Sequence, residues 1–263
     1  MSSFFWKYFN VVNDLMESLI YDEDQVFKFV EILERYNDNN KIPLDFYLQI
    51  HARKKHGSPV ETILARKVIS IKSNLAHEVN KLTPFCGFIY IDRKNNGETV
   101  TETETAIKID NSFISVYITP EARNTYKANT ELACEFSVFL TNKYLDNEHH
   151  SDNKNFNLIS KYYNHIQKNP LSKKFLDIDI DRKDFYPVIV SFLKELKIDP
   201  IMTIETRSGF HILILKHNLS SDQNKAIYTK SKELGSIDLL TNAMVPVPGS
   251  FQGSFKVKLI TEF

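Results

Sequence analysis

The sequence has little glycine, little cysteine and no long apolar run. Only 7 of its 263 residues are glycine, against a usual ~7%, so each glycine marks a turn or a close approach that needs locating. The two cysteines, Cys86 and Cys134, form no CxxC pair, which excludes a disulfide scaffold and a cysteine-built zinc site and fits a reducing compartment. No apolar run nears the ~18 residues of a membrane span, and the N-terminus lacks a signal-peptide pattern. We therefore expect a soluble, cytoplasmic protein with no membrane partner.

Neither sign of charge is in excess, since 33 Lys and Arg residues balance 33 Asp and Glu residues. A protein that grips duplex DNA by its phosphates usually carries a basic excess, so tight, sequence-independent nucleic-acid binding is disfavoured. A nucleotide enzyme is not disfavoured, because a cluster of acids that holds metal ions does not show in the net charge. The sequence also lacks GxxxxGK(S/T) and GxGxxG, which argues against a motor ATPase and a dinucleotide enzyme.

Residues 1–84 are predicted to form a helical N-terminal extension. Apolar residues recur at intervals of three and four from Phe4 to Ile20 and again from Val26 to Leu33, as on one face of an amphipathic helix. The run Ser58-Pro59-Val60-Glu61 has the pattern of a capping box with proline at the first helical position. It predicts a third helix that runs toward Leu82.

Residues 85–170 are predicted to be the N-terminal half of the core, an α/β subdomain. From residue 85 the pattern becomes β-branched and aromatic, which is typical of strands. We expect strands over 85–92, 100–109 and 112–119, and then a helix from Pro120 toward Leu140.

Residues 171–263 are predicted to alternate strand, helix, strand, strand, helix, strand. This order is typical of a ferredoxin-like or RRM-like module, a sheet with helices on one face. The expected fold class is therefore α+β, with an RRM-like catalytic sheet, the N-terminal α/β subdomain and the helical extension. The expected elements are a strand over 175–181, a helix over 188–196, strands over 201–206 and 210–215, a helix from Ser220 to Leu234, and a terminal region after Asp238.

The clearest chemical motif is the run from Phe175 to Asp181, in which aspartate alternates with apolar residues. Because side chains alternate faces along a strand, Asp177, Asp179 and Asp181 share one face. Three carboxylates on an otherwise apolar strand repel one another, and a divalent cation such as Mg²⁺ or Mn²⁺ removes that cost. The other interpretation is an edge strand with an acidic solvent face, which discourages edge-to-edge pairing.

The segment from Thr206 to His211 is a second candidate site. Its Ser-Gly turn, Ser208-Gly209, follows Arg207 and presents backbone N–H groups, a hydroxyl and a cation to an anion. His211 can donate to a phosphate oxygen or a leaving group, but a histidine at the start of a buried strand is also a common core residue. This motif alone leaves both interpretations open.

A third candidate is Asp238, which the turn Pro248-Gly249-Ser250 follows. An acid after a short helix can complete a metal pair, and it can equally be an ordinary loop residue. Three of the seven glycines, Gly235, Gly249 and Gly253, lie in this part of the chain, where the backbone must turn or let a ligand approach.

Taken in order, these three motifs resemble the archaeo-eukaryotic primase superfamily, over roughly residues 85–263. The motifs of that family are a DhD pair, an SxH-like element and an hD step on an RRM-like sheet. The resemblance implies that Asp177, Asp179 and Asp238 are catalytic ligands of two Mg²⁺ or Mn²⁺ ions. It also implies that His211 contacts the nucleotide at the catalytic centre.

The resemblance further implies a nucleotide-binding set in two turns. The expected residues are Arg207, Ser208, Gly209, His211, Gly249, Ser250 and Lys256. Family members often carry an arginine just before the Pro-Gly turn, a place that Val245-Pro246-Val247 fills here, so we expect Lys256 or Lys258 to supply the charge. The stretch from Tyr117 to Arg123 is similar to an Asn-Pro-Arg stretch in the N-terminal half of the family's core.

The function implied is that of a DNA primase or primase-polymerase, a nucleotidyltransferase that joins nucleoside triphosphates on a single-stranded DNA template in DNA replication. The sequence lacks the zinc knuckle of many primases and a fused helicase domain, so a helicase or accessory primase subunit is an expected partner. Two alternatives stay open. The neutral charge and the missing arginine favour a non-catalytic replication or single-strand-binding subunit, and paired aspartates alone also fit a two-metal nuclease.

Overall fold

The computed structural model shows an α+β fold with antiparallel sheets. The described residues are 18–37, 44–70, 73–83, 88–91, 105–108, 110–145 and 156–260. The predicted first helix, Phe4 to Ile20, lies almost wholly outside them. None of the helices in these ranges is both long enough and apolar enough to cross a membrane.

The first sheet is built from segments that are far apart in the sequence. Its strands are β1 (Asp45–Ala52), β2 (Thr62–Ser70), β5 (Ile114–Ile118), β10 (Val245–Pro246), β11 (Phe251–Gln252) and β12 (Phe255–Lys256). They lie in the order β12-β11-β5-β1-β2, and β10 also pairs with β5. The C-terminal part of the chain thus completes a sheet that begins at residue 45.

The second sheet comes from the last third of the chain. Its strands are β6 (Phe175–Ile180), β7 (Met202–Glu205), β8 (Phe210–Leu215), β9 (Ile237–Leu240) and β13 (Lys258–Ile260). They lie in the order β13-β7-β8-β6-β9, and every pair is antiparallel. Helix α6 (Tyr186–Glu195) joins β6 to β7, and α7 (Ser221–Leu234) joins β8 to β9. The elements predicted between residues 175 and 234 are confirmed, with ends that differ by a few residues.

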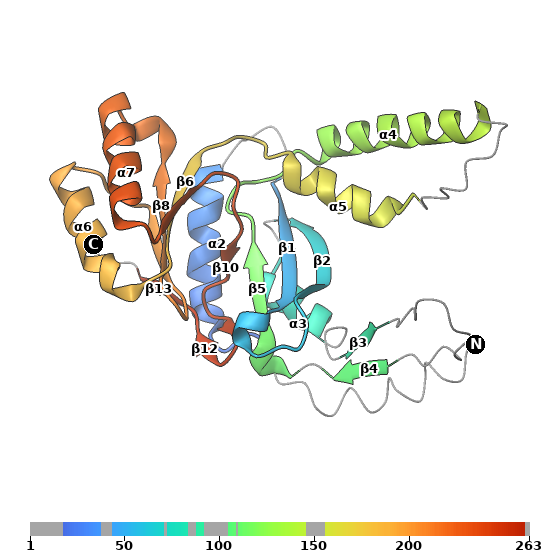
Figure 1. Ribbon diagram of the computed structural model, residues 1–263, viewed down its shortest axis with the longest axis horizontal. Helices are drawn as coiled ribbons and strands as arrows, with labels where there is room; N and C mark the ends of the chain where they lie inside the picture. Colours follow the sequence, from blue (N-terminus) through green and yellow to red (C-terminus); the bar gives the residue numbers. More distant parts are fainter. Residues whose placement is uncertain are drawn as a thin grey trace.

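The remaining elements lie around the first sheet. They are helices α2 (Glu23–Asn37), α3 (Leu75–Leu82), α4 (Thr125–Leu145) and α5 (Leu158–Lys168), and the antiparallel pair β3 (Phe88–Ile91) and β4 (Thr105–Lys108). Helix α2 confirms the second predicted helix, and β3, β4 and β5 lie within the three predicted strands. Helices α4 and α5 pack against each other and extend away from both sheets (Figure 1).

Helix α2 lies between the two sheets (Figure 1) and fills the space between them with apolar side chains. Phe29 and Leu33 of this helix are buried in one continuous core with Leu48 of the first sheet and with Ile204 and Leu213 of the second. Fully burying a side chain of this size contributes about 1.5–3 kcal/mol. This core therefore determines how far apart the two sheets stand.

Helices α6 and α7 cover the opposite face of the second sheet. Leu176, Ile178 and Ile180 of β6 pack there against Ile189 of α6 and Ile227 of α7. Because side chains alternate along a strand, the intervening residues of β6 point to the other face, toward the first sheet.

The predicted helix from Ser58 to Leu82 is wrong except at its end, where α3 forms, and the all-helical character expected for residues 1–84 is wrong as well. Strand β2 occupies residues 62–70 of that stretch and pairs with β1, a strand absent from the sequence-based prediction. The Ser58 hydroxyl accepts the N–H of Val60, so the Ser-x-x-Glu pattern serves a turn rather than a helix cap. The β-branched residues that follow then pack in a pleated strand.

Helix α4 begins at Thr125 rather than at Pro120. The intervening residues form an irregular link, in which the backbone of Arg123 bridges to Asp45 next to the first sheet. The side chain of Asn124 then caps the helix. The long-range bridge therefore outweighs the local signal of a proline at a helix start.

Glycine is required where the β7–β8 turn meets the end of β6. A Cβ at Gly209 would lie 1.5 Å from the backbone oxygen of Ile180. We expect Gly209→Ala to lower the free energy of unfolding by about 2–4 kcal/mol, measured by urea denaturation. Gly235→Ala is the control, because its left-handed backbone carries a strain of about 1–2 kcal/mol while its Cβ would meet no atom within 4 Å. Equal losses in the two variants would contradict the close approach.

Candidate functional site

The register of the second sheet brings the predicted motifs together on three neighbouring strands. Asp179 of β6 lies directly opposite His211 of β8 on one side and Asp238 of β9 on the other. Directly opposed residues of an antiparallel pair point to the same face, with Cβ atoms about 4.5–5.5 Å apart. Asp177, two residues before Asp179, shares that face. We call these four residues the carboxylate–histidine patch.

Asp177 and His211 form a buried pair within this patch. Nδ1 of His211 lies 3.0 Å from Oδ2 of Asp177, and Nε2 lies 3.6 Å from Oδ1 of Asp179. Asp177 is only 2% exposed and His211 8%. The other oxygen of Asp177, Oδ1, is buried without a hydrogen-bond partner in the part of the chain that the structure describes. A buried oxygen that accepts no hydrogen bond costs about 1–3 kcal/mol of stability. Among the described residues, the patch therefore holds one carboxylate oxygen that is available to accept a bond.

Burial and mutual charge shift the pKa values of the patch. Burial by itself lowers the pKa of His211, but the charge and hydrogen bond of Asp177 and the charge of Asp179 outweigh it and raise this pKa to about 8. Burial raises the pKa of Asp179 to about 6, against the lowering effect of His211 and with the support of the Asp177 charge. The single positive charge of His211 thus does not balance the two negative charges of Asp177 and Asp179. Binding of a further cation near these carboxylates would be favoured.

Asp238 and Asp181 lie at the exposed side of the patch. Within the described ranges, no group of three or more His, Cys, Asp or Glu side chains is arranged to hold a metal ion. The donor chemistry nevertheless fits Mg²⁺ or Mn²⁺, because the acids offer hard carboxylate oxygens and Oδ1 of Asp177 has no partner among the described residues.

The β7–β8 turn lies at the end of β6 where the aspartates are. The turn is closed by two hydrogen bonds: Thr206 N–H donates to the Gly209 oxygen at 2.9 Å, and Gly209 N–H donates to Oγ1 of Thr206 at 3.0 Å. Arg207 and Ser208 stand exposed at its tip. The structure therefore brings these expected nucleotide-binding residues next to the patch.

A polar face of the first sheet is joined to this turn. Oε1 of Gln252 accepts the backbone N–H of Arg207 at 2.9 Å, and its Nε2 donates to the hydroxyl of Tyr117 at 3.2 Å. Arg53 donates to the same hydroxyl at 3.4 Å. On β1, Nε2 of His51 lies 2.6 Å from Oε1 of Gln49.

Most of this polar face differs from the sequence-based prediction, in which the stretch was helical or had no assigned structure. The available signal was alternation along β1, where every second residue from Tyr47 to Arg53 is polar and those between are apolar. Such a period of two indicates a strand with one polar face.

A basic turn of the first sheet also faces the patch, and the sequence analysis missed it as well. We call Arg53-Lys54-Lys55-His56-Gly57-Ser58 the basic turn; it contains the short helix η1 (Lys54–His56). The charge of Lys55 lowers the pKa values of both Asp179 and His211. Three successive cations followed by His-Gly were the signal in the sequence.

Glu121 and Arg123, in the segment similar to an Asn-Pro-Arg stretch, are buried near the start of β6. Nη2 of Arg123 lies 3.9 Å from Oε2 of Glu121, and Nη1 donates to the Gln167 oxygen at 2.9 Å. Burial raises the pKa of Glu121 against the charge of Arg123, and the charge of Asp177 adds to the rise. Oε1 of Glu121 also accepts the N–H of Phe175 at 3.4 Å, which ties β6 to the N-terminal half.

Three expected nucleotide-binding residues lie elsewhere, beside the start of α2. Gly249 has a left-handed φ of 81°, and its oxygen accepts the N–H of Tyr21 at 2.8 Å. Ser250 is fully buried and its hydroxyl donates to the Val247 oxygen at 2.6 Å. Nζ of Lys256 lies 5.1 Å from the ring centre of Tyr21. Among the described contacts, none joins these three residues to the patch.

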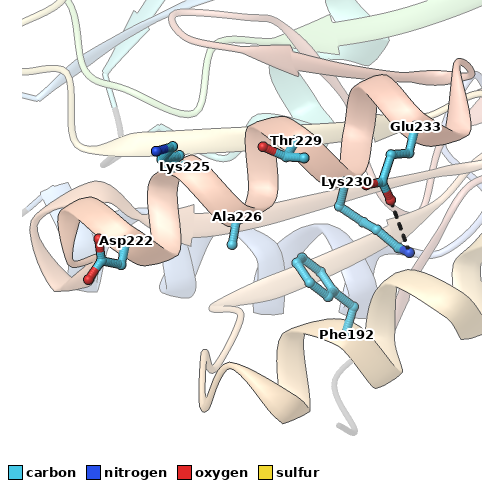
Figure 2. Close-up of a pocket in the computed structure, with 7 residues that line it drawn as sticks. All are labelled: Phe192, Asp222, Lys225, Ala226, Thr229, Lys230 and Glu233. Carbon is cyan, nitrogen blue, oxygen red and sulfur yellow. Dashed lines mark hydrogen bonds and ion pairs between the residues drawn. The ribbon is translucent and has the colours of Figure 1, made fainter.

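A groove of about 460 Å³ lies between α6 and α7, on the side of the second sheet away from the patch. Figure 2 shows its seven lining residues, including Phe192 and an ion pair of Lys230 with Glu233 at 3.4 Å. It contributes no residue to the patch.

Comparisons with known proteins give no match: no family model, no curated protein and no solved structure is significantly similar to this chain. Function is therefore inferred from the patch and from the polar groups that surround it.

The neutral state of His51 makes the fold sensitive to acid. Burial, with the nearby charge of Arg53, lowers the pKa of His51 to about 4 from 6.5. The unfolded chain then binds a proton more readily than the folded one, so this stabilisation is complete above pH ~6.5 and is lost as the pH falls toward 4. We expect His51→Gln to reduce the loss of unfolding free energy between pH 7 and pH 5 by about 1–2 kcal/mol, measured by urea denaturation.

The control for this measurement is His217→Gln, at an exposed histidine. The same pH dependence in the wild type and in both variants would show that His51 does not stay neutral in the folded protein.

Proposed function

We propose that the protein is a metal-dependent nucleotidyltransferase, a primase or primase-polymerase that joins nucleotides on a single-stranded DNA template. The observation that carries the proposal is the meeting of Asp177, Asp179, His211 and Asp238 on one face of adjacent strands. The resemblance to archaeo-eukaryotic primases assigns catalysis to these same four residues. They come from three separate motifs, and strand pairing rather than sequence proximity places them together.

The order of the strands supports an RRM-like module as the setting of this site. In β7-β8-β6-β9, the first and third strands of the module are central and the second and fourth flank them. Two connecting helices cover one face. A βαββαβ unit of ferredoxin-like topology has this antiparallel arrangement, and β13 adds a further strand beside β7. The face opposite α6 and α7, which is turned toward α2 and the first sheet, would then carry the active site.

Asp177, Asp179 and Asp238 would hold Mg²⁺ or Mn²⁺ through carboxylate oxygens. Oδ1 of Asp177, which has no hydrogen-bond partner among the described residues, and the raised pKa of Asp179 both indicate negative charge that a cation would relieve. When bound, two such ions lower the pKa of an attacking 3′-hydroxyl and neutralise a triphosphate and its leaving pyrophosphate. The buried pair places Asp177 rigidly, while the exposed Asp238 leaves one side open to substrate.

The protein's own groups would position the reactants. His211 holds Asp177 by its Nδ1 hydrogen bond and lies where a nucleotide phosphate would approach the carboxylates. Arg207 and Ser208 offer an exposed cation and hydroxyl at the end of β6. Phosphoryl transfer depends mainly on positioning and on stabilisation of charge, so these donors would orient the phosphate chain against the patch.

Template-dependent synthesis tests the proposal. The full chain is incubated with single-stranded DNA, labelled nucleotides and Mg²⁺ or Mn²⁺, with and without a primer. Asp177→Asn and Asp179→Asn remove one charge at nearly constant size, and each is expected to reduce product at least ~100-fold. Asp199→Asn, at an exposed acid before β7, is the matched control and should keep full activity.

Full activity in either patch variant would reject the assignment. A shortened template would indicate a two-metal nuclease instead. Strand binding that needs no metal and yields no product would indicate a non-catalytic subunit. Urea denaturation of each variant separates loss of activity from loss of fold.

Metal binding is also expected to release a proton. His211, with a pKa of about 8, carries a proton at pH 7 that compensates Asp177, and a cation bound to the same carboxylates would displace that charge. Calorimetric titration with Mn²⁺ at pH 7 in two buffers of different ionisation enthalpy should show release of about 0.5–1 proton, reduced in His211→Asn. Binding heats that are identical in the two buffers would contradict this coupling.

A further inference from the structure

Positive charge gathers opposite the carboxylate–histidine patch, at the contact between the two sheets. Lys55 of the basic turn and Arg207 of the β7–β8 turn are both exposed, and His56 lies between them with Nδ1 3.2 Å from Nη1 of Arg207. Within the described ranges, neither cation takes part in an ion pair, whereas the neighbouring Arg53 is paired with Glu61. Among the described residues, these two cations therefore have no acidic partner in an ion pair, and the charge of Lys55 acts on the half-buried Asp179.

The basic turn is held in place by one backbone hydrogen bond and by two close approaches of glycine. Arg53 N–H donates to the Phe113 oxygen at 3.0 Å, and Gly57 has a φ of 102° and lies so close to Phe113 that a Cβ would come within 2.9 Å of its ring. Gly253, in the β11–β12 turn, lies against His56, where a Cβ would be 3.2 Å from the histidine Cβ. The backbone that carries Lys55 is thus fixed before any ligand binds.

His56 is neutral and acts as an acceptor. Burial, with the charges of Lys55 and Arg207, lowers its pKa to about 4. Because a guanidinium can only donate, Nδ1 of His56 accepts the hydrogen bond and the ring proton lies on Nε2. His56 therefore positions Arg207, a residue of the second sheet, from a turn of the first sheet.

We propose that Lys55 and Arg207 form a binding site for the phosphate chain of a nucleoside triphosphate, with His56 as the residue that positions Arg207. The nucleotide identity of the ligand rests on the proposed function; the phosphate site rests on the geometry of the two turns. A triphosphate concentrates several negative charges on one short chain, which suits two neighbouring cations that form no ion pair within the described ranges. A DNA strand instead spaces single charges along its length.

Calorimetric titration with tripolyphosphate tests the site without any catalysis. The wild-type protein should bind it, and Lys55→Ala and Arg207→Ala should each weaken binding about tenfold or more, the usual effect of losing one charge-assisted contact. Lys225→Ala removes the same charge from α7, on the far side of the sheet (Figure 2), and should leave the affinity unchanged. A 12-nucleotide DNA strand without a terminal phosphate serves as the competing ligand.

The role of His56 has its own comparison. His56→Asn keeps an acceptor near the position of Nδ1 and should retain most of the affinity, whereas His56→Leu keeps the bulk without the acceptor and should match Arg207→Ala. Equal affinities in these two variants would overturn the positioning role.

Three outcomes would overturn the phosphate site: no tripolyphosphate binding by the wild type, equal binding by Lys55→Ala and Lys225→Ala, or charge-variant effects confined to the DNA strand. If tripolyphosphate binds as expected but synthesis is absent, the proposed polymerase function fails and the phosphate site stands.

Discussion

Strand β6 can turn its apolar residues toward α6 and α7 only if its aspartates turn toward the first sheet. The pairing of Asp179 with both His211 and Asp238 follows from this single register. A shift of one residue would bury the carboxylates among the leucines and isoleucines beneath the two helices. Because an unpaired buried carboxylate costs several kcal/mol, the register is strongly determined, and the composition of the patch follows from it.

The cost of placing acids between two sheets is offset by positive groups that come from both sheets. His211 pairs with Asp177 inside the second sheet, and the charge of Lys55 reaches Asp179 from the first. Helix α2 determines the separation of the sheets, since its apolar residues pack on both. An apolar core thus sets the distance across which the polar groups act, and it contains none of the residues of the patch.

The parts of the fold that sequence analysis predicted are those whose signals are local. Helix α7 has a capping box at Ser220 and a left-handed glycine at Gly235, and each of these signals lies within a few residues of the helix end that it marks. Strand β2 was missed because the Ser58 pattern fits a turn as well as a helix start. Only the pairing of β2 with β1, within residues 45–70, selects the extended form.

The sequence by itself determined that Asp177 and Asp179 share a face, because alternation along a strand is a property of neighbouring residues. It also showed the turn with Arg207 and Ser208 and its place before His211. Only the tertiary structure decided that Gly249 and Ser250 pack beside α2 and that His56 meets Arg207. Such contacts join residues far apart in the chain, and their positions depend on how the apolar core between the sheets packs, which no local pattern encodes.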